Sequence, residues 1–358
     1  MRLRHILVVF AGIATGYTGA ALGAESGSGV KSSIGLTGLV GKLDNGLKAY
    51  IQGDYTVAMR EWVASAEQGD VAAQFQIGWL YYSGQGVEND IARAIEWWKT
   101  AGSQGDVRAQ TRLGLIFEDG GVVSKDLTQA AKWYRLAAVQ GHAFAQTKLG
   151  YYHENGIGVE KNYDKAARWY NEAANQEMAE ALHRLGHLYM NGLGVERDDA
   201  RAAALFRSAA ELGFSTSAYT LGKMYLEGRG LKIDNFAAFE WISKAANNDI
   251  PAAAYNLGKM YASGRVIKKD VNAAVWWFNR AAIRGHADAT RALAVKYITG
   301  EAVPLEREEG LMWAIVAKKL GEHLPDAAET ALASEVATLT PEQISHARQK
   351  AQSLIKGE

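Results

Sequence analysis

A glycine recurs every 36 residues through most of this chain of 358 residues. The series runs through Gly78, Gly114, Gly150, Gly186, Gly222 and Gly258, and Ala294 takes the seventh place. A tryptophan repeats with the same period, with Leu205 as its one exception, at Trp97, Trp133, Trp169, Trp241, Trp277 and Trp313. A fixed period of this size indicates a solenoid, in which each unit stacks on the next.

Each unit reads as two helices, called helix A and helix B below. Ala73, Ile77 and Leu80 recur at the i, i+4 and i+7 spacing of one helix face. The repeated glycine falls inside helix A, where it costs about 1 kcal/mol of helix propensity against alanine. Such a glycine needs a packing reason, so we expect an aromatic ring of helix B to lie over the missing side chain.

The connections between the two helices carry their own signals. A glycine such as Gly84 stands where helix A ends, and a left-handed turn there favours glycine. An aspartate precedes helix B in five units, where its carboxylate can cap the free N–H groups, at Asp90, Asp126, Asp198, Asp234 and Asp270.

The pattern predicts an all-α fold, a right-handed superhelical solenoid of antiparallel helix pairs. Seven units of 36 residues fit between residues 69 and 320, and the seventh is degenerate. Residues 43–68 lack the full signature and are expected to form an N-terminal capping helix pair. Residues 321–358 are expected to form capping helices at the other end, since a solenoid needs polar outer faces at both ends.

The first 24 residues have the layout of a cleavable signal peptide. Arg2 and Arg4 precede an apolar run, and small residues lead to a preferred cleavage point after Ala24. Residues 25–42 begin rich in glycine and serine and are expected to be a flexible leader. The alternative is an uncleaved membrane anchor. No later segment has the ~18 apolar residues of a span, so we expect a periplasmic or secreted protein without stable membrane insertion after cleavage.

Composition excludes several classes of function. The chain has 39 basic and 39 acidic side chains, which argues against nucleic-acid binding because a phosphate backbone requires a basic face. It has no cysteine, which excludes disulfides, thiolate metal sites and cysteine nucleophiles. No nucleophile–base pair or metal-ligand set stands out, so we expect no enzyme activity and no cofactor.

Residues 145–177 carry the repeat almost in full, with Leu149-Gly150, the loop Gly156-Ile157-Gly158-Val159 and Trp169-Tyr170. This pattern resembles the Sel1-like repeat, a relative of the tetratricopeptide repeat, and the resemblance covers about residues 44–320. Val122 and Val266 depart from it at the second loop glycine, and Gln176-Glu177 departs at one junction between units. The resemblance implies an exported bacterial scaffold that holds other proteins, and in such stacks helix A lines the concave surface.

Positions that vary between repeats while remaining on helix A are candidates for binding. Their spacings of 3, 4 and 7 place them on one face, opposite the apolar stripe. Exposed aromatic side chains mixed with cations suit recognition of a protein or peptide segment. The predicted partner-binding residues are Phe75, Trp79, Tyr151, His183, His187, Tyr219, Lys223, Tyr255 and Lys259. The alternative is that these aromatics pack between neighbouring A helices.

Two further features have structural interpretations. His183 and His187 lie one turn apart on helix A and could hold Zn²⁺, but no H-E-x-x-H motif or further ligand is visible, so no metal site is predicted. The pairs Trp97-Trp98 and Trp276-Trp277 resemble a ligand box out of context, and their phase predicts core positions.

We therefore expect a non-catalytic scaffold in the bacterial envelope, which could regulate a signalling system or hold part of a secretion or polysaccharide assembly. One alternative is an envelope protein that binds peptidoglycan or another glycan, with aromatic rings stacking on sugars. Another is a secreted effector that contacts a host protein.

Overall fold

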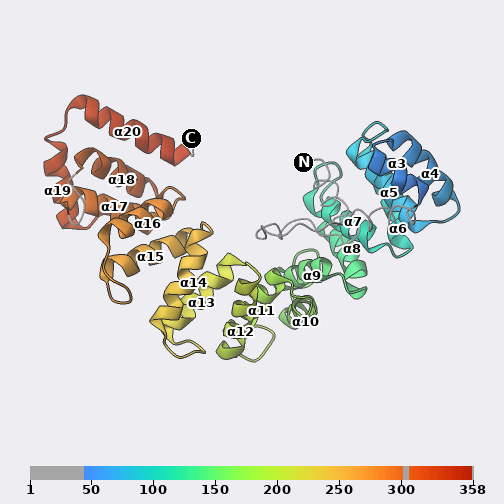
Figure 1. Cartoon of the computed structure of the whole chain (residues 1–358), viewed down its shortest axis with the longest axis horizontal. Coiled ribbons are helices and arrows are strands. Elements are labelled where there is room, and N and C mark those ends of the chain that lie inside the picture. The colour runs from blue at the N-terminus through green and yellow to red at the C-terminus, as the bar shows by residue number, and fades with distance from the viewer. Residues whose placement is uncertain (1–43, 301–305, 357–358) are drawn as a thin grey trace, which may run out of the picture. The chain divides into compact units, whose positions relative to one another are not determined.

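The computed structural model describes residues 44–300 and 306–356, which form two compact units divided between Ala173 and Ala174. Every regular element of the described residues is a helix, which confirms the all-α prediction (Figure 1). The predicted signal peptide and the whole of the predicted leader lie outside the described residues.

The first unit consists of four helix pairs. In chain order its helices are α3 (Asn45–Gln52), α4 (Tyr55–Glu67), α5 (Val71–Ser83), α6 (Ile91–Ser103), α7 (Val107–Asp119), α8 (Leu127–Val139), α9 (Ala143–Asn155) and α10 (Tyr163–Ala174). Odd-numbered helices are A helices and even-numbered ones are B helices, and each helix packs on the next along the chain from α3 to α9.

The second unit continues the alternation and adds two helices at its end. Its helices are α11 (Ala179–Asn191), α12 (Asp199–Glu211), α13 (Ser215–Glu227), α14 (Asn235–Asn247), α15 (Pro251–Ser263), α16 (Val271–Ala282), α17 (Ala287–Thr299), α18 (Arg307–Lys319), α19 (Asp326–Val336) and α20 (Pro341–Lys356). The last two pack on α17 and α18.

Helix ends follow the signals in the sequence. Gly84 ends α5 with a φ of 68°, and its N–H donates to the carbonyl of Leu80. Asp90 caps α6 by accepting from the N–H of Arg93 at 2.9 Å. The other four predicted aspartates cap their B helices in the same way. These five B helices therefore begin at carboxylates that accept from their free backbone N–H groups.

The repeated glycines lie where helix B approaches helix A most closely. A Cβ atom on Gly78 would lie 2.5 Å from the indole of Trp98, and one on Gly114 would lie 2.5 Å from the ring of Tyr134. The same close approach occurs in each of the next four repeats, with Tyr170, Phe206, Ile242 and Phe278 facing Gly150, Gly186, Gly222 and Gly258. The packing reason expected from the sequence is thus present, with an isoleucine in place of a ring in one repeat.

The side chain over the glycine is the residue that follows the constant tryptophan position. Trp98 is fully buried, whereas Trp97 is half-buried and packs on the apolar cluster that joins α5 to the preceding pair α3–α4, with Trp62 and Ile77 among its members. Trp133, Trp169, Trp241 and Trp277 are half-buried in the same way, and Trp313 is buried. Trp276 departs from the core prediction, since its side chain is 55% exposed and it is out of phase with the constant series.

The pair α3–α4 contains the same contact in a shortened form. Gly46 lies directly under Trp62, 16 residues later, whereas Gly78 and Trp98 are 20 residues apart. The connection between the two helices is accordingly short, with only Gly53 and Asp54 between them. This pair keeps the essential packing of a repeat without its loop motif, so the sequence signature does not reveal it.

We predict that Gly114→Ala destabilises the first unit by about 1–3 kcal/mol, because overpacking a close contact costs this much. The new methyl group would meet the ring of Tyr134, which is fully buried and whose hydroxyl donates to Glu118 at 2.6 Å. Urea unfolding followed by circular dichroism measures the change in the free energy of unfolding.

Gly102→Ala is the matched control, since Gly102 is also inside a helix but a Cβ there would lie 3.1 Å from its nearest neighbour, Trp133. Both variants gain the same helix propensity, so their difference reports how much tighter the contact at Gly114 is than the contact at Gly102. Equal stability of the two variants would contradict the role given to the glycine.

Candidate functional site

The predicted partner-binding face lies on the A helices, and its residues differ in exposure. Phe75 on α5 is only 6% exposed. Its ring packs near Trp98, and the guanidinium of Arg108, on the next A helix, lies 4.3 Å from the ring centroid. Phe75 thus serves mainly as packing between repeats, which leaves little of it for a partner.

Trp79 and Tyr151 are half-buried at the next position of this face. The guanidinium of Arg112 on α7 lies 5.0 Å from the ring of Trp79, while Tyr151 packs on the apolar cluster around Tyr152 and Leu149. Burial lowers the pKa of Arg112. In the first unit the predicted face is therefore made of aromatic rings that are partly covered by neighbouring side chains.

In the second unit, Tyr219, Lys223, Tyr255 and Lys259 form a group that we call the Tyr–Lys surface. Tyr219 and Lys223 lie one turn apart on α13, with the ammonium 6.0 Å from the ring centroid. Tyr255 and Lys259 repeat this arrangement on α15 at 5.5 Å. Asn256 links the two A helices by donating to the hydroxyl of Tyr219 at 2.8 Å. Both lysines are exposed, and both tyrosines are half-buried.

The two histidines of α11 lie together with ring centroids 4.6 Å apart. His183 is hydrogen-bonded through Nδ1 to the hydroxyl of Ser217 at 2.7 Å and packs against Phe206 and Phe214. Desolvation, followed by the charges of His187 and Arg184, lowers the pKa of His183 to about 3, so its ring is neutral at physiological pH. His183 therefore belongs largely to the contact between α11 and α13.

The described chain contains no group of side chains that could serve as a set of metal ligands. Within residues 44–300 and 306–356, no three His, Cys, Asp or Glu side chains come together in a way that could hold an ion. His183 has one of its ring nitrogens engaged by Ser217. Likewise, no helix among the described residues is long and apolar enough to cross a membrane.

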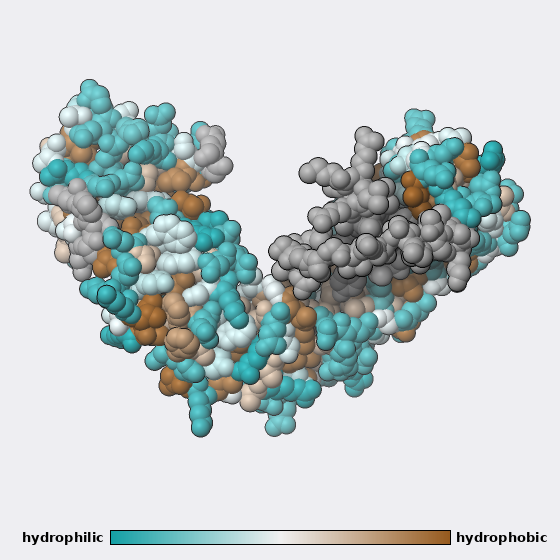
Figure 2. All heavy atoms as spheres, in the orientation of Figure 1, coloured by the Kyte–Doolittle hydropathy of each residue, from teal (hydrophilic) through white to brown (hydrophobic). Residues whose placement is uncertain are grey.

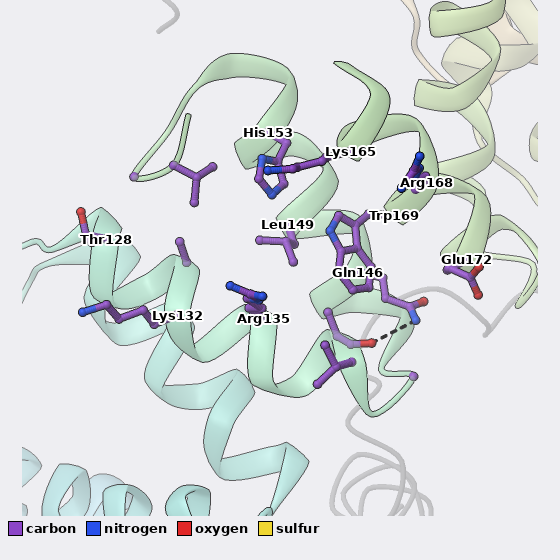
Figure 3. A pocket seen from close by; sticks show the side chains of 16 residues that line it. Thr128, Lys132, Arg135, Gln146, Leu149, His153, Lys165, Arg168, Trp169 and Glu172 are labelled. Carbon is purple, nitrogen blue, oxygen red and sulfur yellow. Dashed lines mark hydrogen bonds between the residues drawn. The ribbon is translucent and has the colours of Figure 1, made fainter. Parts of the chain in front are cut away.

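A second surface, which the sequence did not indicate, lies on the B helices of the first unit. A hollow of about 890 Å³ opens between α8 and α10, with α9 beneath it (Figure 3). Lys132 and Arg135 border it on α8, and Lys165 and Arg168 border it on α10. We call this the basic hollow. Its four cations lie on two different helices 30 residues or more apart, so no local charge run signals them.

One sequence signal does mark the basic hollow. His153 stands at a position where every other repeat has a tyrosine or phenylalanine, namely Tyr81, Phe117, Tyr189, Tyr225, Tyr261 and Tyr297. Desolvation lowers the pKa of His153, and the charges of Lys165 and Arg135 lower it further against the opposing effect of a backbone hydrogen bond. A smaller ring thus replaces the larger aromatic side chain at this place.

The remaining surface of both units is mixed. Hydrophilic residues dominate the described part of the view in Figure 2, with apolar residues in small patches among them. Exposed large apolar side chains on the B helices include Leu136, Phe236 and Trp276. Scattered exposure of this kind is ordinary for a folded protein.

These features define an all-helical repeat protein with surfaces suited to binding. A family model described as the Sel1 repeat matches six consecutive stretches, residues 71–106, 107–142, 143–178, 179–214, 215–250 and 251–286. The chain belongs to the Sel1 repeat family, whose members are in general non-catalytic scaffolds that bind proteins. The seventh unit proposed from the sequence lies beyond these matches and stays a prediction.

Two solved structures are similar over most of the repeats. One is a protective antigen present in uropathogenic Escherichia coli strains, with 32% identity, a TM-score of 0.73, and coverage of 87% of this chain and 68% of that chain. The other is a Sel1 repeat protein from Oxalobacter formigenes, with 35% identity, a TM-score of 0.58, and coverage of 67% and 97%. A comparison with curated protein sequences found no match.

We predict that His183 makes the stability of the second unit depend on pH. Its folded pKa of about 3 lies below the ~6.5 of an unfolded histidine. The unfolded chain therefore binds an extra proton below pH 6.5, and stability is full above that pH and falls as the pH decreases. His183→Thr, which copies Thr111 and Thr147 of earlier repeats, removes this loss.

Urea unfolding of both proteins at pH 7.5 and pH 5 measures the effect. The advantage of wild type over His183→Thr is expected to shrink by about 1 kcal/mol between the two values, since each pH unit contributes at most ~1.4 kcal/mol and partial solvation reduces it. Taking the difference in unfolding free energy between the two proteins cancels the contribution of the carboxylates, which titrate in both. A difference that is constant with pH would show that His183 is not neutralised by folding.

Proposed function

We propose that this protein is a non-catalytic scaffold of the bacterial envelope, periplasmic or secreted, that binds a protein or peptide segment through the exposed faces of its A helices. The observation that carries the proposal is the Tyr–Lys surface. Two adjacent A helices present the same pair, a half-buried tyrosine and an exposed lysine, in the same geometry. An aromatic anchor beside a cation suits an extended segment with apolar and acidic side chains.

Of the residues predicted from the sequence, Trp79, Tyr151, His187, Tyr219, Lys223, Tyr255 and Lys259 are proposed as direct contacts. Phe75 and His183 are proposed to support them from within, because burial and contacts with the adjacent repeat occupy them. The role given to each residue rests on contacts within its own unit. Each unit contributes its own part of the face.

A glycan as the main ligand is less well supported. Sugar recognition by stacking needs an uncovered aromatic face, but the ring of Tyr255 lies 4.7 Å from His286 in a stacked arrangement and beside Lys259. The ring of Tyr219 has Lys223 beside it and its hydroxyl bonded to Asn256. These contacts favour recognition of a segment that reaches the lysines and the ring edges.

The location is proposed from the N-terminal layout of charge, apolar run and small residues. A relative described as a protective antigen supports a protein that leaves the cytoplasm. We predict that, in its own bacterium or a close relative, the processed protein begins at Glu25 and is found in the periplasmic fraction or the medium. N-terminal sequencing of that fraction checks this, and a product that keeps residues 1–24 in the membrane fraction would favour the anchor.

We predict that photo-crosslinkers at Lys223 or Lys259 in living cells give a discrete protein adduct, identified by mass spectrometry. Both residues are exposed, so substitution leaves the core intact. A crosslinker at Phe236 is the matched control, since it is 63% exposed on a B helix of the same unit.

A second crosslinking experiment tests whether charge contributes to this contact. With the crosslinker at Thr216, an exposed position on α13, Lys223→Glu with Lys259→Glu should lower the adduct at least tenfold. Adducts of equal yield at Phe236 and at the lysines, or an adduct unaffected by the charge reversal, would exclude the Tyr–Lys surface. Adducts that contain only peptidoglycan or other glycan would favour the glycan alternative.

A further inference from the structure

The basic hollow has apolar walls and charged edges. Apolar residues line it, among them Leu149 of α9, Ala131 of α8 and Val159 of the loop after α9. Trp169 of α10 adds an indole ring. Figure 3 shows Leu149 and Trp169 between the cationic side chains of α8 and those of α10. A hollow of about 890 Å³ is in the size range of ligand sites in proteins, ~300–1,000 Å³.

The charges around the hollow are unbalanced. Four exposed cations, Lys132, Arg135, Lys165 and Arg168, line it together with a single acidic side chain, Glu172. Ion pairs of the described residues engage many other cations, such as Arg280 with Asp249 at 2.7 Å, but none involves these four. Gathering like charges around a low-dielectric hollow raises its positive potential and attracts anions.

Comparison with the other repeats shows why these cations are available. Where another repeat has a cation at the position that corresponds to Lys165, this cation lies over the aromatic ring that corresponds to His153. Arg201 lies 4.3 Å from the ring centroid of Tyr189, and Arg93 lies 5.6 Å from that of Tyr81. A cation–π contact of this kind holds and partly screens the charge.

The cation in phase with Arg135 shows the same relation. Arg207 donates to the hydroxyl of Tyr225 at 2.5 Å, and the ammonium of Lys99 lies 6.0 Å from the ring centroid of Phe117. At the basic hollow the ring is His153, whose pKa is lowered in part by the cations beside it. His153 therefore offers neither a large π face nor a phenol to these cations, and its smaller side chain leaves the space unfilled.

We propose that the basic hollow is a docking site for an acidic segment of a partner protein. Carboxylates of the segment pair with the cations of α8 and α10, and an aliphatic side chain between them rests on Leu149 and Trp169. The apolar lining favours a peptide over an inorganic anion or an anionic sugar, because neither of those has an apolar side chain to bury there. This site is on the B helices and is independent of the Tyr–Lys surface.

The full-length protein without residues 1–24 is titrated into a fluorescein-labelled peptide made of repeated Glu-Glu-Leu-Glu-Glu units, and binding is followed by fluorescence anisotropy. Binding is expected at low ionic strength and should weaken severalfold at high salt, because exposed charges are screened. The same peptide with glutamine in place of each glutamate is expected to bind at least tenfold more weakly.

Two variants place the binding in the hollow. Lys132→Glu with Arg168→Glu should weaken it at least tenfold. Its control, Lys232→Glu with Lys268→Glu, makes the same charge change at exposed loop lysines that are likewise 36 residues apart, and should bind as wild type. His153→Tyr restores the ring of the other repeats without removing a cation, and should also weaken binding at least tenfold while leaving the fold intact.

The outcomes divide cleanly. Loss of binding in the double reversal and in His153→Tyr, with the loop control unchanged, supports the proposal. Equal weakening by both double reversals shows a non-specific charge effect and overturns it, as does full binding by His153→Tyr. An oligogalacturonate that binds in the hollow when the peptide does not would replace the peptide with an anionic glycan and overturn the proposal as stated. Crosslinking at Lys223 and Lys259 is unaffected in every case, so the two surfaces are tested separately.

Discussion

The contact between a glycine of helix A and a bulky side chain of helix B determines the rest of this structure. It brings the backbone of helix A directly against a buried ring, as with Gly150 under Tyr170. Such close packing leaves no room for a methyl group, so the two helices of a pair have one preferred separation and rotation. The contact therefore sets how the two helices of each pair face each other.

A second set of contacts fixes each pair to the one before it. Trp133 packs against Gly102 of the preceding helix B, and Gln110 of α7 donates to the carbonyl of Gly102 on α6 at 2.8 Å. Gln146 of α9 donates to the carbonyl of Ala138 on α8 at 3.2 Å, so the same contact recurs one period later. These amides are buried, so a shift of one residue would leave a polar group without its partner. The repeats of the first unit are thereby held in register.

The fold could be predicted from the sequence because these contacts recur. A period of 36 residues repeats the same glycine, ring and cap, and repetition separates structural positions from variable ones without any knowledge of relatives. The contact of Gly46 with Trp62 escaped this reasoning, because these two residues are four positions closer together than Gly78 and Trp98 and so lose the phase. The buried ring over the glycine lies one residue after the constant tryptophan position. That tryptophan is constant because it contacts the preceding pair, and not because it lies over the glycine.

The candidate sites were harder to predict for a related reason. A variable position on helix A is not necessarily free, and Phe75 and His183 show that such a position can instead adapt to its neighbour in the next repeat. The exposure of each side chain on this face depends on the pair beside it. The cations of the basic hollow come from two B helices, and their proximity requires the actual packing of α8 on α9 and of α9 with α10.

A residue that departs from the repeat pattern can have a structural or a functional reason, and the two are distinguished by whether a neighbouring residue compensates for the change. Ala294 replaces the glycine of helix A in α17, and the alanine expected in the facing helix becomes Gly310, which has room for no Cβ beside Ile298. The small residue has moved from one helix to the other, so the close approach is kept and the exception is structural. His153 replaces a larger aromatic side chain, yet the neighbouring positions remain cationic and nothing fills the space. An uncompensated change that gathers unpaired charges costs stability unless something outside the chain offsets it. For this reason the basic hollow, more than any constant feature of the repeat, directs attention to a binding partner.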